Sequence, residues 1–90
     1  MSFSAHKQFR KDFQKHARSN RKDVLAVVQT MFAIVAGEPL PPNARPHPLA
    51  PPYDGCMECH IGGDLLLIWK DDGQEVTFVR LGTHSELFDE

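Results

Sequence analysis

The sequence lacks the features of membrane proteins and of disulfide-stapled secreted domains. It contains no run of about 20 apolar residues, and its first seven residues include no apolar signal core. Its only cysteines, Cys56 and Cys59, lie too close in sequence to staple a fold of 90 residues. We therefore expect a cytoplasmic protein with no membrane association, held together by a hydrophobic core.

Charge is nearly balanced overall, with a net value of −2, but it is unevenly distributed along the chain. Residues 1–50 carry eight Lys and Arg against three Asp and Glu, whereas residues 51–90 carry two against nine. Seven of the ten basic residues lie between Lys7 and Lys22. This segment is either a solvated helical face or a surface that binds RNA or another partner.

The first half of the chain has the pattern of two helices. A chain of 90 residues with 41% hydrophobic residues predicts one domain, residues 1–90, with a modest core. Ser4 is the expected N-cap of a helix that runs to about Arg18, and Asn20 that of a second helix. The second helix has a core-facing stripe at three- and four-residue spacing, formed by Val24, Val27, Val28, Met31, Phe32 and Val35. Gly37 and Pro39 then predict its end.

All seven prolines fall within residues 39–52, so this segment is predicted to be neither helix nor central strand. His47 lies between Pro46 and Pro48, and the proline that follows it holds its backbone extended. A histidine restrained in this way loses little conformational freedom when it binds a ligand.

The second half has the pattern of hairpin-linked strands. We predict strands over residues 55–61, 64–70 and 74–81, with turns at Gly62-Gly63 and at residues 71–73. Residues 65–69 (LLLIW) are apolar on both faces, which is typical of a central strand. Helices followed by such strands predict an α+β domain with an antiparallel sheet.

Residues 56–60 (CMECH) match the C-x-x-C-H signature of c-type haem attachment. Haem attachment of this kind follows export, for which the chain shows no signal, and the motif leads into a strand rather than a helix. A zinc site formed by Cys56, Cys59, His60 and another histidine has suitable ligand types, but only one C-x-x-C is present. Two reduced cysteines packed in a strand are the favoured interpretation, with no cofactor and no metal.

Four polar residues of the second half form a candidate catalytic set: His47, His60, Asp64 and His84. Histidine titrates near neutral pH, so two histidines can act as base and acid in one reaction. RNA supplies its own nucleophile, the 2′-hydroxyl group, so such a set needs no activated serine or cysteine.

Three segments, in their order and spacing, resemble the YafQ family of toxins. They are residues 45–49 (RPHPL), 58–69 (ECHIGGDLLLIW) and 80–88 (RLGTHSELF), and residues 9–12 (FRKD) before a second helix are also similar. The resemblance implies a RelE-like fold, in which a helical hairpin packs on a twisted antiparallel sheet. It also implies an endoribonuclease that cleaves messenger RNA in the ribosomal A site and is restrained by a cognate antitoxin, with DNA contacted only through that antitoxin.

By position, the resemblance places His47, His60, Asp64 and His84 among the catalytic residues. It places Arg80 near the scissile phosphate and Phe88 at the edge of the site. On this basis we assign His47 as general base and His84 as general acid, although these two roles could be exchanged. His60 and Arg80 would stabilise the transition state, and Asp64 would orient a histidine.

The basic helices, with Lys11, Lys15 and Arg18, are expected to contact ribosomal RNA. Two positions depart from the family pattern, because Met57 stands where YafQ has arginine and Leu65 where it has tryptophan. The loss of an arginine supports an alternative function, a toxin-like module that binds a protein without cleaving RNA.

Overall fold

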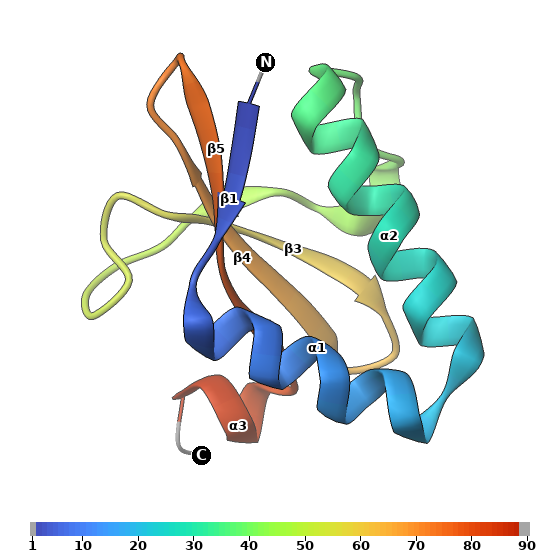
Figure 1. Ribbon diagram of the computed structural model, residues 1–90. Helices are drawn as coiled ribbons and strands as arrows, with labels where there is room; N and C mark the ends of the chain where they lie inside the picture. The colour runs from blue at the N-terminus through green and yellow to red at the C-terminus, as the bar shows by residue number, and fades with distance from the viewer. Residues whose placement is uncertain (1, 89–90) are drawn as a thin grey trace.

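The computed structural model describes residues 2–88 and confirms the α+β class (Figure 1). The elements, in chain order, are β1 (Ser2–Ala5), α1 (Lys7–Ser19), α2 (Arg21–Ala36), the 3-10 turn η1 (Pro42–Ala44), β2 (His47–Pro48), β3 (Met57–Gly62), β4 (Leu65–Asp71), β5 (Glu75–Gly82) and α3 (His84–Phe88). Strands β3, β4 and β5 match the three predicted strands to within two residues at each end.

The predicted boundaries of the second helix are confirmed, but the residue predicted to be the N-cap of the first helix is wrong. The Asn20 side chain accepts a hydrogen bond from the Lys22 amide at 3.0 Å, and Gly37 ends α2 with a φ of 73°. Ser4 instead lies in β1, where its hydroxyl contacts Glu75 and Thr77, and α1 begins only at Lys7. No helix within residues 2–88 is long and apolar enough to cross a membrane.

The sheet has the order β1-β5-β4-β3-β2, so β4 is its central strand, as the apolar run of residues 65–69 predicted. Neighbouring strands from β2 to β5 are antiparallel. Strand β1 pairs in parallel with β5, from Ser2↔Glu75 to Ala5↔Phe78, which corrects the expectation of a purely antiparallel sheet. The two-residue β2, which follows Pro46 and ends on Pro48, occupies the opposite edge, where a missing N–H costs no ladder hydrogen bond.

The two faces of the sheet carry separate apolar clusters. On one face, Leu65, Leu67 and Trp69 pack with residues of α1 and α2, including Phe9 and Val27. On the other face, the alternate residues Leu66 and Ile68 pack with Leu87 of α3 and with Tyr53 of the loop before β3. Two helices therefore cover one face, while α3 and this loop cover the other.

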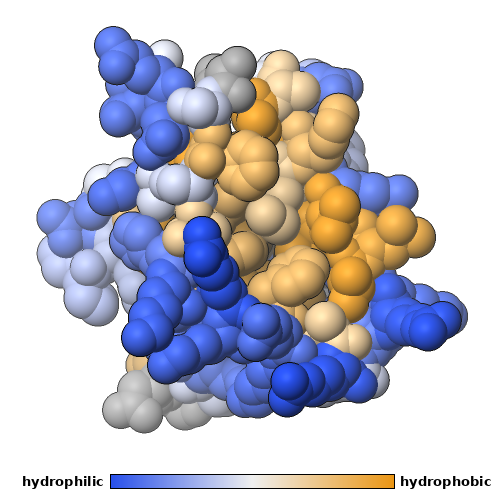
Figure 2. All heavy atoms as spheres, viewed as in Figure 1, coloured by the Kyte–Doolittle hydropathy of each residue, from blue (hydrophilic) through white to orange (hydrophobic). Residues whose placement is uncertain are grey.

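The predicted core stripe of α2 is only partly buried. Of the predicted stripe, Val27 is 1% exposed, whereas Phe32 is 71% exposed and Val28 46%. Ile34, which the predicted stripe does not include, is buried. Figure 2 shows apolar residues gathered on this side of the molecule, bordered by hydrophilic residues along α1. The assignment of Phe32 and Val28 to the core was wrong, because α2 turns part of its apolar surface beyond the edge of the sheet.

Candidate active site

The turn between β3 and β4 places Asp64 beside α3. A register shift between His60 and Gly62 pairs Gly62 with Leu65, so the turn consists of Gly63 and Asp64 rather than Gly62-Gly63. His60 pairs with Leu66, so His60 and Asp64 are not cross-strand partners. From the turn, Asp64 Oδ1 accepts a hydrogen bond from His84 Nδ1 at 2.6 Å.

Helix α3, which carries His84, is fixed at its start by a capping box. The Thr83 hydroxyl accepts from the Glu86 amide at 3.3 Å, and Glu86 Oε1 accepts from the Thr83 amide at 2.9 Å. Glu86 also binds Lys15 and, at 3.1 Å, His16 of α1. The hydrogen bond from Lys15 and that from the Thr83 amide lower the pKa of Glu86 to about 2. The carboxylate therefore joins the basic helix α1 to the helix that carries His84.

Aromatic rings connect the histidines with the far end of α3. The His60 and His84 ring centroids are 6.2 Å apart, and those of His84 and Phe88 are 6.1 Å apart. Phe88 in turn makes an edge contact with Tyr53 at 5.7 Å. His60, His84 and Phe88 thus form one continuous ring surface, with Asp64 on His84.

Arg80 reaches the same cluster through Tyr53. Its Nη1 lies 3.4 Å from the Tyr53 hydroxyl, which itself donates to the Leu87 carbonyl. Arg80 Nε donates to the buried Asp12 of α1 at 2.8 Å, and Asp12 also accepts from the Leu81 amide at 3.1 Å. The hydrogen bond to Asp12 raises the pKa of Arg80, so the guanidinium is held as a fixed positive charge.

His47 lies on edge strand β2, where it pairs with Glu58 of β3. Its Nδ1 is 3.0 Å from the Arg45 carbonyl oxygen and its Nε2 is 3.3 Å from Glu58 Oε1. Cross-strand partners share a face, and residues two apart in a strand also share a face at a spacing of about 7 Å. His47, Glu58 and His60 therefore lie on the face that α3 covers.

The structure thus brings His60, Asp64, His84 and Phe88 into direct contact, joins Arg80 to them through Tyr53, and sets His47 along the same face. Lys11 and Arg18 are exposed on α1, whereas Lys15 is engaged by Glu86. Sequence reasoning missed four contact residues: Asp12, His16, Glu58 and Glu86. Only Glu86 had a readable signal, since residues 83–86 (THSE) have the capping-box pattern.

The cysteines do not form the alternative zinc site. Cys59 is fully buried with the cluster under α1 and α2, whereas Cys56 packs in the cluster on the opposite face. Burial raises the pKa of Cys59 to about 12 and that of Cys56 above its ordinary value. Within residues 2–88, no three His, Cys, Asp or Glu side chains are grouped to hold a metal ion. A haem attached to the buried Cys59 sulfur would require the apolar residues packed under α1 and α2 to separate.

The two departures from the family pattern lie outside the site. Met57 is half-buried against the cluster under α1 and α2, and Leu65 is a buried member of that cluster. Neither side chain lies on the face that carries Glu58 and His60. Met57 in place of arginine therefore gives little support to a module that has lost catalysis.

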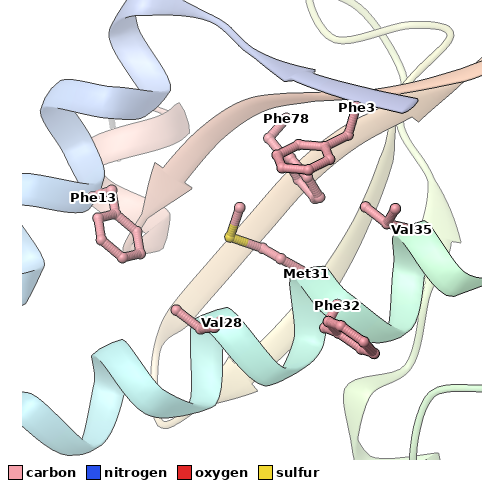
Figure 3. Close-up of a pocket in the computed structure, with 7 residues that line it drawn as sticks. All are labelled: Phe3, Phe13, Val28, Met31, Phe32, Val35 and Phe78. Carbon is pink, nitrogen blue, oxygen red and sulfur yellow. The ribbon is translucent and has the colours of Figure 1, made fainter. Parts of the chain in front are cut away.

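A second surface feature lies on the helix side, between β1, α1 and α2. It is an open groove of about 300 Å³ with an entirely apolar lining (Figure 3), formed by Phe3, Phe13, Val28, Met31, Phe32, Val35 and Phe78. Phe3 is 57% exposed and makes an edge contact with the buried Phe78 at 6.0 Å. Phe3, Val28 and Phe32 are exposed large apolar residues that gather at this groove, which makes it a candidate protein interaction site.

Residues 1–89 match the family model described as bacterial toxin of type II toxin-antitoxin system, YafQ. The mRNA interferase toxin YafQ of Escherichia coli strain BL21-DE3 is 34% identical over 82 residues, which cover 90% of this chain and 88% of the relative. A YafQ toxin of Haemophilus influenzae is 30% identical over 92 residues, which cover 96% and 90%.

Solved structures agree with these sequence matches. The crystal structure of YafQ from E. coli strain BL21(DE3) superposes with a TM-score of 0.87 at 31% identity, covering 97% of each chain. A metal-bound toxin from Helicobacter pylori gives 0.88 at 31% identity over 98% of this chain and 99% of its own. The E. coli DinJ–YafQ complex gives 0.85 at 32% identity, covering 97% of each chain. The chain therefore belongs to the YafQ family of toxins from type II toxin–antitoxin systems.

Proposed function

We propose that this protein is a cytoplasmic endoribonuclease that cleaves messenger RNA in the ribosomal A site by histidine acid–base chemistry. The observation that carries the proposal is the convergence of His60, His84, Asp64 and Phe88, from a hairpin and a separate helix, at one surface. Relatives that are 33–34% identical are named mRNA interferase toxins, which supports the same substrate class.

In the proposed reaction the 2′-hydroxyl oxygen attacks the adjacent phosphorus, and the bond from phosphorus to the 5′-oxygen breaks. His47 takes the proton of the 2′-hydroxyl, and His84 gives a proton to the 5′-oxygen. Arg80 and His60 stabilise negative charge on the phosphoryl oxygens. The products are a 2′,3′-cyclic phosphate and a 5′-hydroxyl end.

The basic face of α1 supports docking on ribosomal RNA. Lys11 and Arg18 are exposed, and Lys15 and His16 join the same helix to α3 through Glu86. Positive charge on α1 therefore lies beside the helix that carries His84. Replacing Lys11 and Arg18 with Gln should weaken ribosome binding and reduce its log–log salt slope by somewhat under one unit for each lost phosphate contact. Lys15 is left intact in this test, because its loss would also release α3.

The partner proposed for the apolar groove is the cognate antitoxin, through an amphipathic helix with acidic flanks. The apolar lining requires an apolar helix face, and the exposed basic residues of α1 beside the groove favour acidic neighbours on that helix. The solved DinJ–YafQ complexes are toxin–antitoxin pairs, which supports a partner of this class.

The H. pylori relative is described as metal-bound. The cleavage proposed for this chain is written with its own side chains and the 2′-hydroxyl group of the RNA.

The proposal is tested with the purified chain and translating ribosomes, by mapping the ends of the messenger RNA fragments. We expect cyclic phosphate and 5′-hydroxyl ends, and a rate about 10²–10⁴-fold lower for His84→Ala. Ser85→Ala is the matched control, because Ser85 is the exposed neighbour of His84 in α3. If the wild-type protein binds its antitoxin but leaves messenger RNA intact, the protein-binding module is the correct function.

A further inference from the structure

Glu58 is a buried carboxylate that has no part in the cleavage as described above. Its side chain is 4% exposed, and it lies in β3 opposite the half-exposed His47 of β2. One oxygen, Oε1, is 3.3 Å from His47 Nε2. The other, Oε2, is buried with no hydrogen-bond partner among the described residues.

The opposite side of the His47 ring is held by the backbone. A carbonyl oxygen only accepts, so the 3.0 Å contact with Arg45 O requires a proton on Nδ1. Arg45 has a φ of 45°, a left-handed conformation uncommon for a residue with a side chain. The Arg45 carbonyl, set by an unusual backbone conformation, therefore holds the Nδ1 side of the ring, while Glu58 Oε1 lies 3.3 Å from Nε2.

This arrangement defines which nitrogen of His47 exchanges a proton. With Nδ1 donating to Arg45, the nitrogen that gains or loses a proton is Nε2, the one beside Glu58. The Glu58 carboxylate therefore lies next to any positive charge that forms on the ring. In a cleavage reaction, a base at His47 acquires that positive charge when it removes the 2′-hydroxyl proton.

We propose that Glu58 is a positioning residue of the cleavage reaction, which orients the His47 ring and stabilises the imidazolium formed when Nε2 accepts the 2′-hydroxyl proton. The inference rests on the proposed function, because it assumes that His47 is the base. A purely structural role does not account for Oε2, since a buried carboxylate oxygen without a partner lowers stability. A glutamine of the same size would link β2 to β3 without a buried charge.

The test compares the full-length wild-type protein with Glu58→Gln and with Glu75→Gln. Glu75 is a matched control, because it is a strand glutamate whose hydrogen bonds go to Ser2 and Ser4 of β1 rather than to a histidine. Three quantities are measured: kcat and KM on translating ribosomes, the melting temperature, and the ¹⁵N resonances of the histidine rings.

For Glu58→Gln we expect kcat to fall about 10- to 100-fold, less than the loss on removing an acid–base group itself. We expect KM and the melting temperature to stay near wild type, and the His47 ring resonances to shift, because the negative charge 3.3 Å from Nε2 is removed. Glu75→Gln should leave kcat and the His47 resonance unchanged. An unchanged His47 resonance or an unchanged kcat in Glu58→Gln would overturn the inference, as would a fall in kcat that parallels loss of folded protein.

The two proposals fail in different ways. If wild-type protein does not cleave RNA, the proposed function fails, while the ring resonances still show whether Glu58 interacts with the His47 ring. If wild-type protein cleaves and Glu58→Gln cleaves equally fast, the proposed function stands and the role of Glu58 is wrong.

Discussion

His84 and Asp64, 20 residues apart in sequence, share the 2.6 Å hydrogen bond between His84 Nδ1 and Asp64 Oδ1. The carboxylate accepts from Nδ1, which sets the tautomer and the orientation of the ring. We predict that Asp64→Asn lowers kcat, by less than His84→Ala, because the amide oxygen can still accept the bond but the negative charge is lost. Cleavage assays on ribosomes measure both variants. A value of kcat for Asp64→Asn equal to that of wild type would show that the pair has no role in the reaction.

Glu86 should make the stability of the protein depend on acid pH. Its pKa is lowered from 4.5 to about 2, so its contribution is fully present above pH 4.5 and is lost as the pH falls through 2. We predict that the difference in unfolding free energy between wild type and Glu86→Gln shrinks across this window. Urea titrations at several pH values measure it, with Glu38→Gln, an exposed carboxylate beyond α2, as the control for net charge. A difference that is the same at pH 5 and pH 2 would contradict the prediction.

Asp12 is predicted to be the most important polar residue for stability. Asp12→Ala removes the partner of Arg80 and the acceptor of the Leu81 amide. Loss of one member of a buried ion pair costs about 3 kcal/mol, which urea denaturation would detect. Gln8→Ala is the control, since it removes only the 3.1 Å contact between Gln8 and Asp12, and we expect a change under about 0.5 kcal/mol. Equal effects of the two variants would show that the Arg80 pair adds no stability.

Phe32 is predicted to be an energetic centre of the antitoxin interface. Its ring lines the groove and is 71% exposed, so Phe32→Ser should cost the free toxin little stability. We expect antitoxin affinity to fall at least about tenfold, measured by calorimetry. Leu25→Ser is the matched control, because Leu25 is 60% exposed on the same helix but does not line the groove. If both variants bind the antitoxin like wild type, the antitoxin occupies another surface.

The two thiols should be unreactive in the folded protein. With a pKa of about 12, Cys59 is thiolate in roughly one molecule in 10⁴ at pH 8, and Cys56 is also raised above its ordinary value. We predict slow alkylation by iodoacetamide in buffer and rapid alkylation in urea.

Cleavage of messenger RNA should survive a zinc-selective chelator at fixed magnesium. Loss of activity that added zinc restores would instead favour a metal site that includes these cysteines.

Local patterns in the sequence determined most of the secondary structure. The Asn20 cap, the Gly37 stop and the apolar run of residues 65–69 depend on interactions within a few residues, so they were readable without a tertiary structure. The histidines and Asp64 were identified by residue type and by the resemblance to a family. Strand β1 was missed because an alternation of only four residues, 2–5 (SFSA), is too short to predict a strand, and its pairing with β5 joins residues 73 apart.

The contacts of the site were decided only by the tertiary structure. A one-residue register shift in the β3–β4 hairpin placed Asp64 in the turn, and only the return of α3 brought His84 to it. Glu58 reads as an ordinary strand residue until β2 places His47 opposite it, and Asp12 reads as a surface residue of α1 until Arg80 binds it. Sequence patterns report the local preference of a residue for helix, strand or turn. Which polar groups meet across the molecule depends on strand register and helix docking, which are set by the packing of the whole core.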